Sequence, residues 1–502
     1  QSDMFNIIVG VDKMGTLRVT NSPCKFVGRT IQQYANHTSS EGKVKILADG
    51  ASPYIVTTGK TDRAVYQWKF LPHKFAEGDN SGKNPKTHWT EEAKKPVDRY
   101  GDIGNRPWQS GLLPPSGGNP VEDKSPPPNS ARLKHVFGLS PKSIFYTRSG
   151  DIIYSNAAMG VKYDKLHHRQ SFYFGHAPNK ITAVHVDYTG HFVVSGEECN
   201  CPQLRVWSAS TCNHIATLPK LHRKSIKLVH FSRSANQIVS VGGERNQVVA
   251  IWERDHRVGE WQRGRLKCFQ SFGKLPIFFA AFSESQQYHG AGGHELFTGG
   301  ASHVTLWKIT GLNLLPIRTY RQYASPFLLE MDREPPVVFA AMLCGALCGP
   351  DIVTGSAAGD IFIWHTLRGE VSQYLPKRHA FPISAITSKG EVIITGDFGS
   401  NVKIWNGLWD LVQTFSLDNQ FEEKLSKIVT MAMDFSGEIC AVTTDKNEVY
   451  EISLCGAGGY GHKTLLLDSH YYWNLRGLDL HPFDEDIFVT VGDDSSIRIW
   501  SI

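Results

Sequence analysis

The sequence predicts an all-β protein built around a β-propeller, a ring of four-stranded sheets that are called blades. Runs of alternating apolar and polar residues, separated by turn-forming Gly, Asp, Asn and Pro, predict many short strands. Strands that close on an aromatic residue recur along most of the chain. Their spacing indicates a blade period of roughly 40 to 45 residues, typical of propellers, with loops inserted in two blades.

The clearest copy of the repeat covers residues 473–502. Residues 475–480 and 487–491 are two predicted strands separated by a polar turn, and Gly492-Asp493-Asp494-Ser495 leads into a third strand that ends at Trp500. Strand, polar turn, strand, Gly-Asp turn and strand together make three of the four strands of a blade.

The amino-terminal part repeats the same pattern. Residues 5–11 and 16–20 are predicted strands, and residues 43–70 supply a further set that closes at Trp68. Because a strand pair begins at the fifth residue, we expect this chain to be a piece of a longer protein. Residues 1–70 are therefore assigned to the terminal blades of a preceding propeller.

Residues 71–131 have a different composition, rich in Pro, Gly, Asn and charge, and are predicted to be a linker between propellers. Pro107 and Trp108 lie in this segment. An aromatic side chain in a polar linker is a candidate anchor against a neighbouring surface.

Blade endings resume after the linker and define a predicted seven-bladed propeller within residues 132–455, with its ring over about residues 144–452. The seven closing aromatic residues are Tyr163, Trp207, Trp252, Trp307, Trp364, Trp405 and Tyr450. The glycine-rich residues 456–462 interrupt the pattern. Residues 456–502 are therefore predicted to start a following propeller.

The blades resemble the WD40 type in a divergent form. An Asp six positions before the closing Trp, which orients a buried hydrogen-bond network in that type, is present at Asp62 and Asp494. Only Gly175-His176 matches its Gly-His pair. In the other repeats the Asp position is occupied by Cys201, Asn246, Ala301, Ala358 and Gly399.

Composition excludes several classes of protein. The net charge of +5, from 53 basic and 48 acidic residues, is too small to indicate nucleic acid as a partner. No run of 18 apolar residues suits a membrane span. Nine cysteines, with no second Cys or His pair at zinc-finger spacing beside Cys199-Asn200-Cys201 or Cys344–Cys348, predict buried thiols without disulfide or metal.

No catalytic motif is present. The sequence has no Gly-x-Ser-x-Gly, P-loop, His-Glu-x-x-His or kinase motif. His167-His168, His176 and His222 fall in predicted turns between blades, where histidines usually make capping hydrogen bonds. We expect neither an enzyme nor a cofactor.

Two basic stretches are candidate partner-binding sites. The first has four cations and no acid within eight residues, and the second surrounds a predicted inter-blade loop that also holds acids. Both are expected on one rim of the propeller, either as solvated loops or as a contact for an acidic partner. The candidate residues are Lys220, Arg223, Lys224, Lys227, Arg254, Arg257, Arg263, Arg265 and Lys267.

A longer pattern resembles one family. Arg106-Pro107-Trp108-Gln109-Ser110-Gly111, a Pro-rich spacer and Leu133-Lys134-His135-Val136-Phe137-Gly138 resemble the echinoderm microtubule-associated protein-like family. The resemblance implies a hydrophobic motif at Leu133, Val136, Phe137 and Gly138, packed at the junction of tandem propellers. An ordinary edge strand that closes a ring is the alternative. Leu139-Ser140-Pro141 departs from the Tyr-Arg that usually follows in the family.

The resemblance also implies the function. It predicts a non-enzymatic microtubule-associated protein of the cytoplasm and cytoskeleton that binds tubulin or the microtubule lattice through propeller surfaces. A ciliary axoneme, with other axonemal proteins as partners, is a candidate location, because an array of rigid discs suits a regular lattice. The alternative is a general scaffold or adaptor in a multiprotein complex. Neither nucleic acid nor a membrane is expected as a partner.

Overall fold

The computed structural model describes residues 7–12, 14–21, 32–39, 42–47, 54–72, 129–255, 261–283, 296–301, 303–321, 340–349, 351–365, 370–417, 425–454, 462–484 and 486–501. The described residues form strands, turns and one short 3₁₀ helix, η2 (Trp261–Arg263). They group into two compact units, one made of residues 137–473 and the other of residues 1–136 and 474–502.

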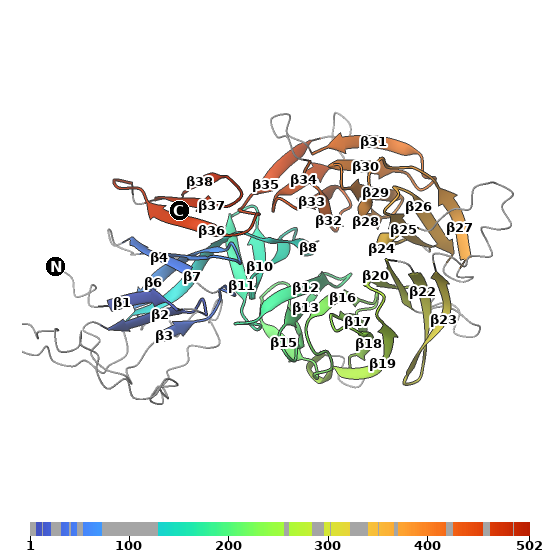
Figure 1. Ribbon diagram of the computed structural model, residues 1–502, viewed down its shortest axis with the longest axis horizontal. Coiled ribbons are helices and arrows are strands. Elements are labelled where there is room, and N and C mark those ends of the chain that lie inside the picture. Colours follow the sequence, from blue (N-terminus) through green and yellow to red (C-terminus); the bar gives the residue numbers. More distant parts are fainter. Residues whose placement is uncertain are drawn as a thin grey trace, which may run out of the picture. The chain divides into compact units, whose positions relative to one another are not determined.

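Residues 137–473 contain seven four-stranded antiparallel sheets, blades 1 to 7, which confirms the predicted propeller fold (Figure 1). Blade 1 consists of β8 (Ser140–Tyr146), β9 (Ile152–Asn156), β10 (Met159–Asp164) and β11 (Arg169–Tyr173). Blade 2 consists of β12 (Lys180–Val186), β13 (Phe192–Glu198), β14 (Leu204–Ser208) and β15 (His214–Thr217). Blade 3 consists of β16 (Ile226–Phe231), β17 (Gln237–Gly242), β18 (Gln247–Glu253) and β19 (Arg265–Gly273).

The remaining blades follow the same order. Blade 4 consists of β20 (Ile277–Phe282), β21 (Leu296–Gly300), β22 (His303–Thr310) and β23 (Asn313–Arg321). Blade 5 consists of β24 (Met342–Cys348), β25 (Asp351–Ser356), β26 (Ile361–His365) and β27 (Glu370–Leu375). Blade 6 consists of β28 (Ile383–Lys389), β29 (Val392–Asp397), β30 (Asn401–Trp405) and β31 (Leu411–Ser416). Blade 7 consists of β32 (Ile428–Met433), β33 (Ile439–Thr444), β34 (Val449–Ser453) and β35 (Lys463–Leu467).

The first strand of each blade is its inner strand, and each inner strand contacts the next one around the ring. Figure 1 shows β12, β16, β20, β24 and β28 around the centre, with the fourth strands β19, β23, β27 and β31 outside. We call the end of the ring where inner strands begin the amino rim, and the end where they finish the carboxyl rim. Since strands alternate in direction, the loops after second and fourth strands lie at the amino rim.

The ring closes between blade 7 and blade 1. Strand β32 contacts β8, and the Thr443 hydroxyl donates a hydrogen bond of 2.7 Å to the carbonyl of Pro141. Glu451 accepts a hydrogen bond of 2.6 Å from the Tyr146 hydroxyl and pairs with the Lys165 ammonium at 2.7 Å. First and last blades are therefore joined by polar contacts as well as by packing.

The core lies within and between the blades. The closing tryptophans predicted from the sequence are buried, and each packs among Val, Ile, Leu and Phe side chains from its own and adjacent sheets. These tryptophans are Trp207, Trp252, Trp307, Trp364 and Trp405. Burial of one large aromatic per blade gives every sheet the same apolar anchor.

Three further sheets make up residues 1–136 and 474–502. They are β1 (Ile7–Val11), β2 (Leu17–Asn21) and β3 (Gln32–Tyr34); β4 (Gly42–Leu47), β5 (Tyr54–Gly59), β6 (Val65–Pro72) and β7 (Asn129–Phe137); and β36 (Leu475–Leu480), β37 (Ile487–Gly492) and β38 (Ile497–Ser501). Strand β4 contacts both β1 and β36, and the Leu475 N–H donates to the Lys60 carbonyl at 2.9 Å.

Two boundaries differ from those expected. The sequence assigns residues 1–70 and 456–502 to separate propellers, whereas the structure groups β1–β7 with β36–β38 in one unit and gives β35 to blade 7. The closing aromatic lies on the third strand of a blade. The fourth strand comes after this recognisable motif, so the sequence pattern does not predict it. Contacts between segments that lie more than 400 residues apart cannot be predicted from local sequence patterns.

The predicted hydrophobic motif lies largely on β7, the outer strand of the β4–β7 sheet. Leu133 and Val136 are buried there, Phe137 is half-buried, and the Ala131 N–H donates to the Tyr34 hydroxyl at 2.8 Å. Gly138 follows with a φ of 134°, a conformation that favours glycine. The division between the two units falls between Val136 and Phe137. A role at a propeller junction remains a prediction.

Candidate functional site

The first basic stretch lies at the amino rim. Lys220, Arg223 and Lys224 occupy the loop between β15 of blade 2 and β16 of blade 3, and Lys227 is the second residue of β16. All four side chains are exposed. The loop is fixed by the Ser225 carbonyl, which accepts a hydrogen bond of 2.7 Å from the Gly243 N–H.

The second basic stretch lies at the opposite end of blade 3. The Arg254 N–H donates to the Asn236 carbonyl at 3.1 Å, next to the start of β17, whereas Ile226 pairs with Gly242 at its end. The two stretches are separated by the length of β18, roughly 20 Å for seven residues. The expectation of one shared rim is corrected, because the second stretch follows a third strand and the first follows a fourth.

Two cations of the second stretch already have an acidic partner. Arg265 bonds Glu253 through Nε at 2.9 Å and Nη2 at 2.7 Å, and Lys267 lies 3.4 Å from the same carboxylate. Burial alone would raise the pKa of Glu253, but these cations outweigh it and lower the pKa. Arg254 is half-buried and Arg263 exposed, while Arg257, Pro107 and Trp108 lie outside the described residues.

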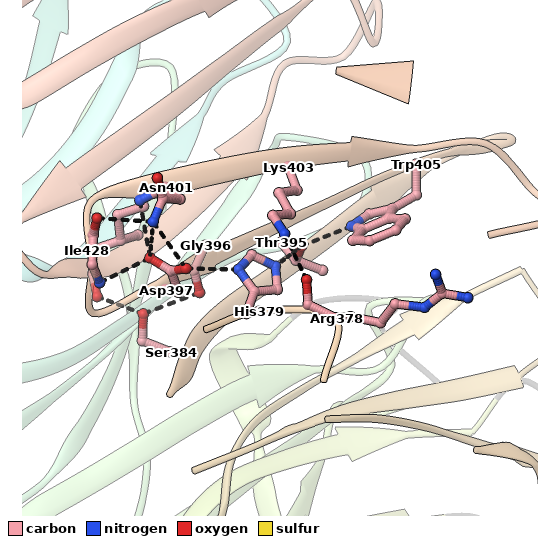
Figure 2. Close-up of polar contacts among 11 residues, drawn as sticks. Arg378, His379, Ser384, Thr395, Gly396, Asp397, Asn401, Lys403, Trp405 and Ile428 are labelled. Atoms are coloured by element: carbon pink, nitrogen blue, oxygen red, sulfur yellow. Dashed lines mark hydrogen bonds and ion pairs between the residues drawn. The ribbon is translucent and has the colours of Figure 1, made fainter. Parts of the chain in front are cut away.

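Each of several blades holds a buried network that resembles a catalytic triad. In blade 6 the His379 imidazole lies 2.8 Å from Asp397 through Nδ1 and 2.7 Å from the Thr395 hydroxyl through Nε2 (Figure 2). The Trp405 indole N–H donates to the same hydroxyl at 2.8 Å. Burial would raise the pKa of Asp397, but hydrogen bonds from His379 and Asn401 lower it.

The same four-residue arrangement recurs in three other sheets. Distances from the imidazole to the acid and to the hydroxyl range from 2.7 to 3.2 Å. The sets are His37, Asp62, Thr57 and Trp68; His176, Glu197, Ser195 and Trp207; and His222, Glu244, Ser240 and Trp252. Each histidine tethers the loop before a blade to the second and third strands of that blade.

The networks stabilise the fold and do not present a nucleophile. Thr395, Ser195, Ser240 and Thr57 are fully buried, so no substrate carbon can approach their hydroxyl oxygens. The indole N–H also occupies each oxygen as an acceptor. Catalysis by nucleophilic attack needs an accessible hydroxyl beside its base. The described histidines act here as structural hydrogen-bond partners, and burial lowers the pKa of His176.

Sequence reasoning missed three of the four acids. It searched six positions before the closing Trp, where only Asp62 of these four lies, whereas Glu197 lies ten positions before Trp207, and Glu244 and Asp397 lie eight positions before Trp252 and Trp405. In all three cases the acid directly follows a glycine at the end of the second strand. A hydroxyl residue followed closely by Gly and an acid was the available signal.

Side chains that can bind a metal ion are scattered among the described residues. No group of three or more His, Cys, Asp or Glu side chains there could hold a metal ion. The seven cysteines in the described part of the chain carry free thiols: Cys199, Cys201, Cys212, Cys268, Cys344, Cys348 and Cys440. Within the same residues, no helix has the length and apolar character needed to cross a bilayer.

Comparison with known proteins identifies related chains. Residues 461–501 match the family "WD domain, G-beta repeat", which covers β35 and β36–β38. Echinoderm microtubule-associated protein-like 2 of Rattus norvegicus is 25% identical over 392 residues, covering 75% of this chain and 55% of that protein. The 77 kDa echinoderm microtubule-associated protein of Lytechinus variegatus is 23% identical over 399 residues, covering 76% and 54%.

A further relative and a solved structure complete the comparison. Echinoderm microtubule-associated protein-like 1 of Homo sapiens is 22% identical and covers 74% of this chain and 43% of that protein. The computationally designed Ika8 protein is 18% identical, with a TM-score of 0.45, and covers 73% of this chain and 98% of that chain. The chain spans about half the length of the curated relatives. It is a propeller protein with a WD repeat, similar over about three quarters of its length to echinoderm microtubule-associated proteins.

Proposed function

We propose that this chain is a non-enzymatic microtubule-associated protein that binds tubulin or the microtubule lattice through a rim of its seven-bladed ring. The similarity to proteins named as microtubule-associated carries the proposal. The ring adds a rigid disc whose triad-like networks are buried, which leaves its rims as the surfaces for a partner.

The charges favour the amino rim over the carboxyl rim. Lys220, Arg223, Lys224 and Lys227 are exposed, and none forms an ion pair within the described part of the chain. Exposed ion pairs contribute only about 0.2–1 kcal/mol each, so several must act together and binding must weaken with salt. An acidic protein surface such as that of tubulin fits this group of cations.

Co-sedimentation with polymerised tubulin tests the proposal. K220E/R223E/K224E/K227E is expected to reduce pelleting at low salt by about tenfold or more, while the thermal midpoint stays unchanged. The carboxyl-rim variant R254E/R263E is the control and is expected to pellet like the parent. If the parent itself stays in the supernatant at about 50 mM salt, where screening is weak, the function is contradicted.

A ciliary axoneme is the proposed location, because a rigid disc suits a regular lattice and axonemal proteins would then be further partners. Expression of the tagged chain in ciliated cells tests this: signal along the axoneme supports the location, and signal confined to cytoplasmic microtubules contradicts it.

A general scaffold or adaptor is the second candidate function. Three loops at the carboxyl rim, between third and fourth strands, each expose a leucine: Leu166 by 86%, Leu312 by 78% and Leu408 by 82%. These leucines lie singly in three different blades, so they would bind only a partner large enough to span the rim. L166S/L312S/L408S distinguishes the two functions, because it is expected to leave microtubule pelleting unchanged and to abolish capture of an adaptor partner.

A further inference from the structure

We propose that the amino rim binds an acidic, extended polypeptide segment through an arc of lysines on neighbouring inner strands. The arc consists of Lys142, Lys180, Lys227 and Lys274, of which only Lys227 belongs to the basic stretches found in the sequence. The inference deepens the proposed function by naming the chemistry of the bound segment. It rests on that function only for the identity of the protein that carries the segment.

The arc follows from where each inner strand begins. Lys142 is the third residue of β8, Lys180 the first of β12, Lys227 the second of β16, and Lys274 precedes β20 by three residues. These four inner strands are consecutive around the ring. Their lysines therefore form one curved row at the amino rim, and Lys427, just before β32 of the adjoining blade 7, extends it.

The lysines have no partner of opposite charge in the described residues. All four side chains are exposed, and none forms an ion pair there. The acids at this rim are fewer, and some are engaged: Glu244 holds His222 at 3.2 Å, and Asp445 accepts the Lys427 backbone N–H at 2.8 Å. Among the described residues, Glu198, opposite Lys180 in the strand register, and Asp468, after β35 of blade 7, are exposed acids at this rim.

The strand geometry places part of the row where neighbouring inner strands meet. Every inner strand from β12 to β32 has a register irregularity near its start, at the third residue of β12 and at the second residue of the others. At that position Thr182 and Ser384 donate hydrogen bonds of 2.6 Å to the carbonyls of Ile226 and Ile428 on the next inner strand. Lys227 and Phe278 occupy the same position in β16 and β20 and are exposed there.

This placement favours a single extended chain over other anionic partners. Residues that face neighbouring inner strands are reached by one strand of polypeptide more readily than by a flat bilayer or a wide duplex. Lysine ammonium groups are point charges that attract carboxylates and phosphates alike, so the curved arrangement of the row carries the preference for an extended chain. Phe278, 40% exposed beside Lys274 and Lys227, offers an apolar contact between carboxylates.

Fluorescence anisotropy with the whole chain and a labelled glutamate-rich peptide of about ten residues tests the inference. Binding at low salt is expected, and it should weaken steeply as salt rises because exposed charges are screened. K142E/K180E/K227E/K274E should lose at least about tenfold in affinity. The carboxyl-rim control R148E/R169E/R254E/R263E removes equal charge and should bind like the parent. An arc variant that binds like the parent overturns the proposal.

Two further arms identify the partner. Single-stranded RNA and vesicles of anionic lipid are titrated in parallel, and tighter arc-dependent binding of either than of the peptide overturns the acidic-polypeptide assignment. Microtubule pelleting separates the two proposals: pelleting without peptide binding rejects this inference alone, and peptide binding without pelleting rejects the proposed function alone. If the charge-reversed arc does not fold, K142Q/K180Q/K227Q/K274Q gives the same readout, with a smaller loss expected.

Discussion

At the scale of single residues, the stability of blade 6 depends on one hydroxyl group. Thr395 is fully buried and links His379 to Trp405 in blade 6. Thr395→Val keeps the shape and leaves an imidazole nitrogen and an indole N–H without a partner. We expect a loss of about 2–4 kcal/mol in the free energy of unfolding, measured by urea denaturation.

The control is Thr414→Val in the same sheet. Thr414 is exposed on β31, opposite Lys403 in the register. Its replacement should change the free energy of unfolding by less than about 0.5 kcal/mol. Equal effects of the two substitutions would show that the network does not contribute.

A pair of neutral histidines makes stability depend on pH. The ring centroids of His185 and His230 lie 3.9 Å apart on inner strands β12 and β16, with Tyr188, Phe145 and Phe231 around them. The Phe231 N–H donates to His185 Nδ1, and His230 Nδ1 bonds the Phe231 carbonyl. Burial lowers the pKa of His230 to about 4 and, together with His230, lowers that of His185 well below its usual value.

The sign of the effect follows from the lowered pKa values. Between pH 6.5 and 4 the unfolded chain binds protons on these histidines and the folded chain does not, so stability falls as the pH falls. His230→Gln should make the thermal midpoint depend less on pH in this window. The part of the unfolding free energy that varies with pH should shrink by an amount on the order of 2 kcal/mol. His191→Gln, an exposed histidine at the same rim, should leave the profile unchanged. Parallel profiles for parent and His230→Gln would contradict the assignment.

At the scale of strands and blades, ring closure depends on Glu451. This residue of β34 joins blade 7 to Tyr146 and Lys165 of blade 1. Glu451→Gln should lower the free energy of unfolding by about 1–2 kcal/mol, since it removes the ion pair and weakens the hydrogen bond. Hydrogen exchange should speed up selectively in β8 and β32–β35.

Glu391→Gln is the matched control, because Glu391 is exposed in the turn before β29 and belongs to blade 6 rather than to the joint between blades 7 and 1. Uniform faster exchange in all seven blades after Glu451→Gln would mean that the ring opens as a whole rather than at the joint between blades 7 and 1.

Much of the ring was predictable because its signals are local. A closing aromatic such as Trp405 predicts the third strand of a blade, and a run of Val and Ile before a glycine predicts the second. Outer strands β35 and β7 carry no such signal, and β7 joins its sheet across residues 73–128. The number of strands that precede a loop within its blade determines the rim on which the loop lies. Because the fourth strand was not predicted, Arg254 was assigned to the wrong rim. The pairing of Arg265 with Glu253 needed the β18–β19 register.

At the scale of the whole molecule, the two units should unfold separately. The ring of residues 137–473 closes on itself, whereas the other unit has three sheets and exposes Ile497 by 72% and Ile499 by 74% on β38. Less buried apolar area per residue means lower stability. Calorimetry should show two transitions, the lower one from residues 1–136 and 474–502.

Two substitutions assign the transitions. Trp68→Ala should lower only the first midpoint temperature, and Trp405→Ala only the second. Each substitution should cost about 3–5 kcal/mol in the free energy of unfolding of its unit, because both indoles are buried. A single transition that moves with either substitution would show instead that the units unfold as one cooperative body.

The pairing of β36 with β4 has a mechanical consequence. The ring of residues 137–473 is inserted in the chain between two parts of the other unit. Tension applied between residues 7 and 501 therefore reaches the ring only after β36 has separated from β4, including the bond from Leu475 to Lys60 and the Lys45–Asp479 pair. Until those contacts rupture, the pulling force bypasses the ring, so this junction shields residues 137–473 from tension.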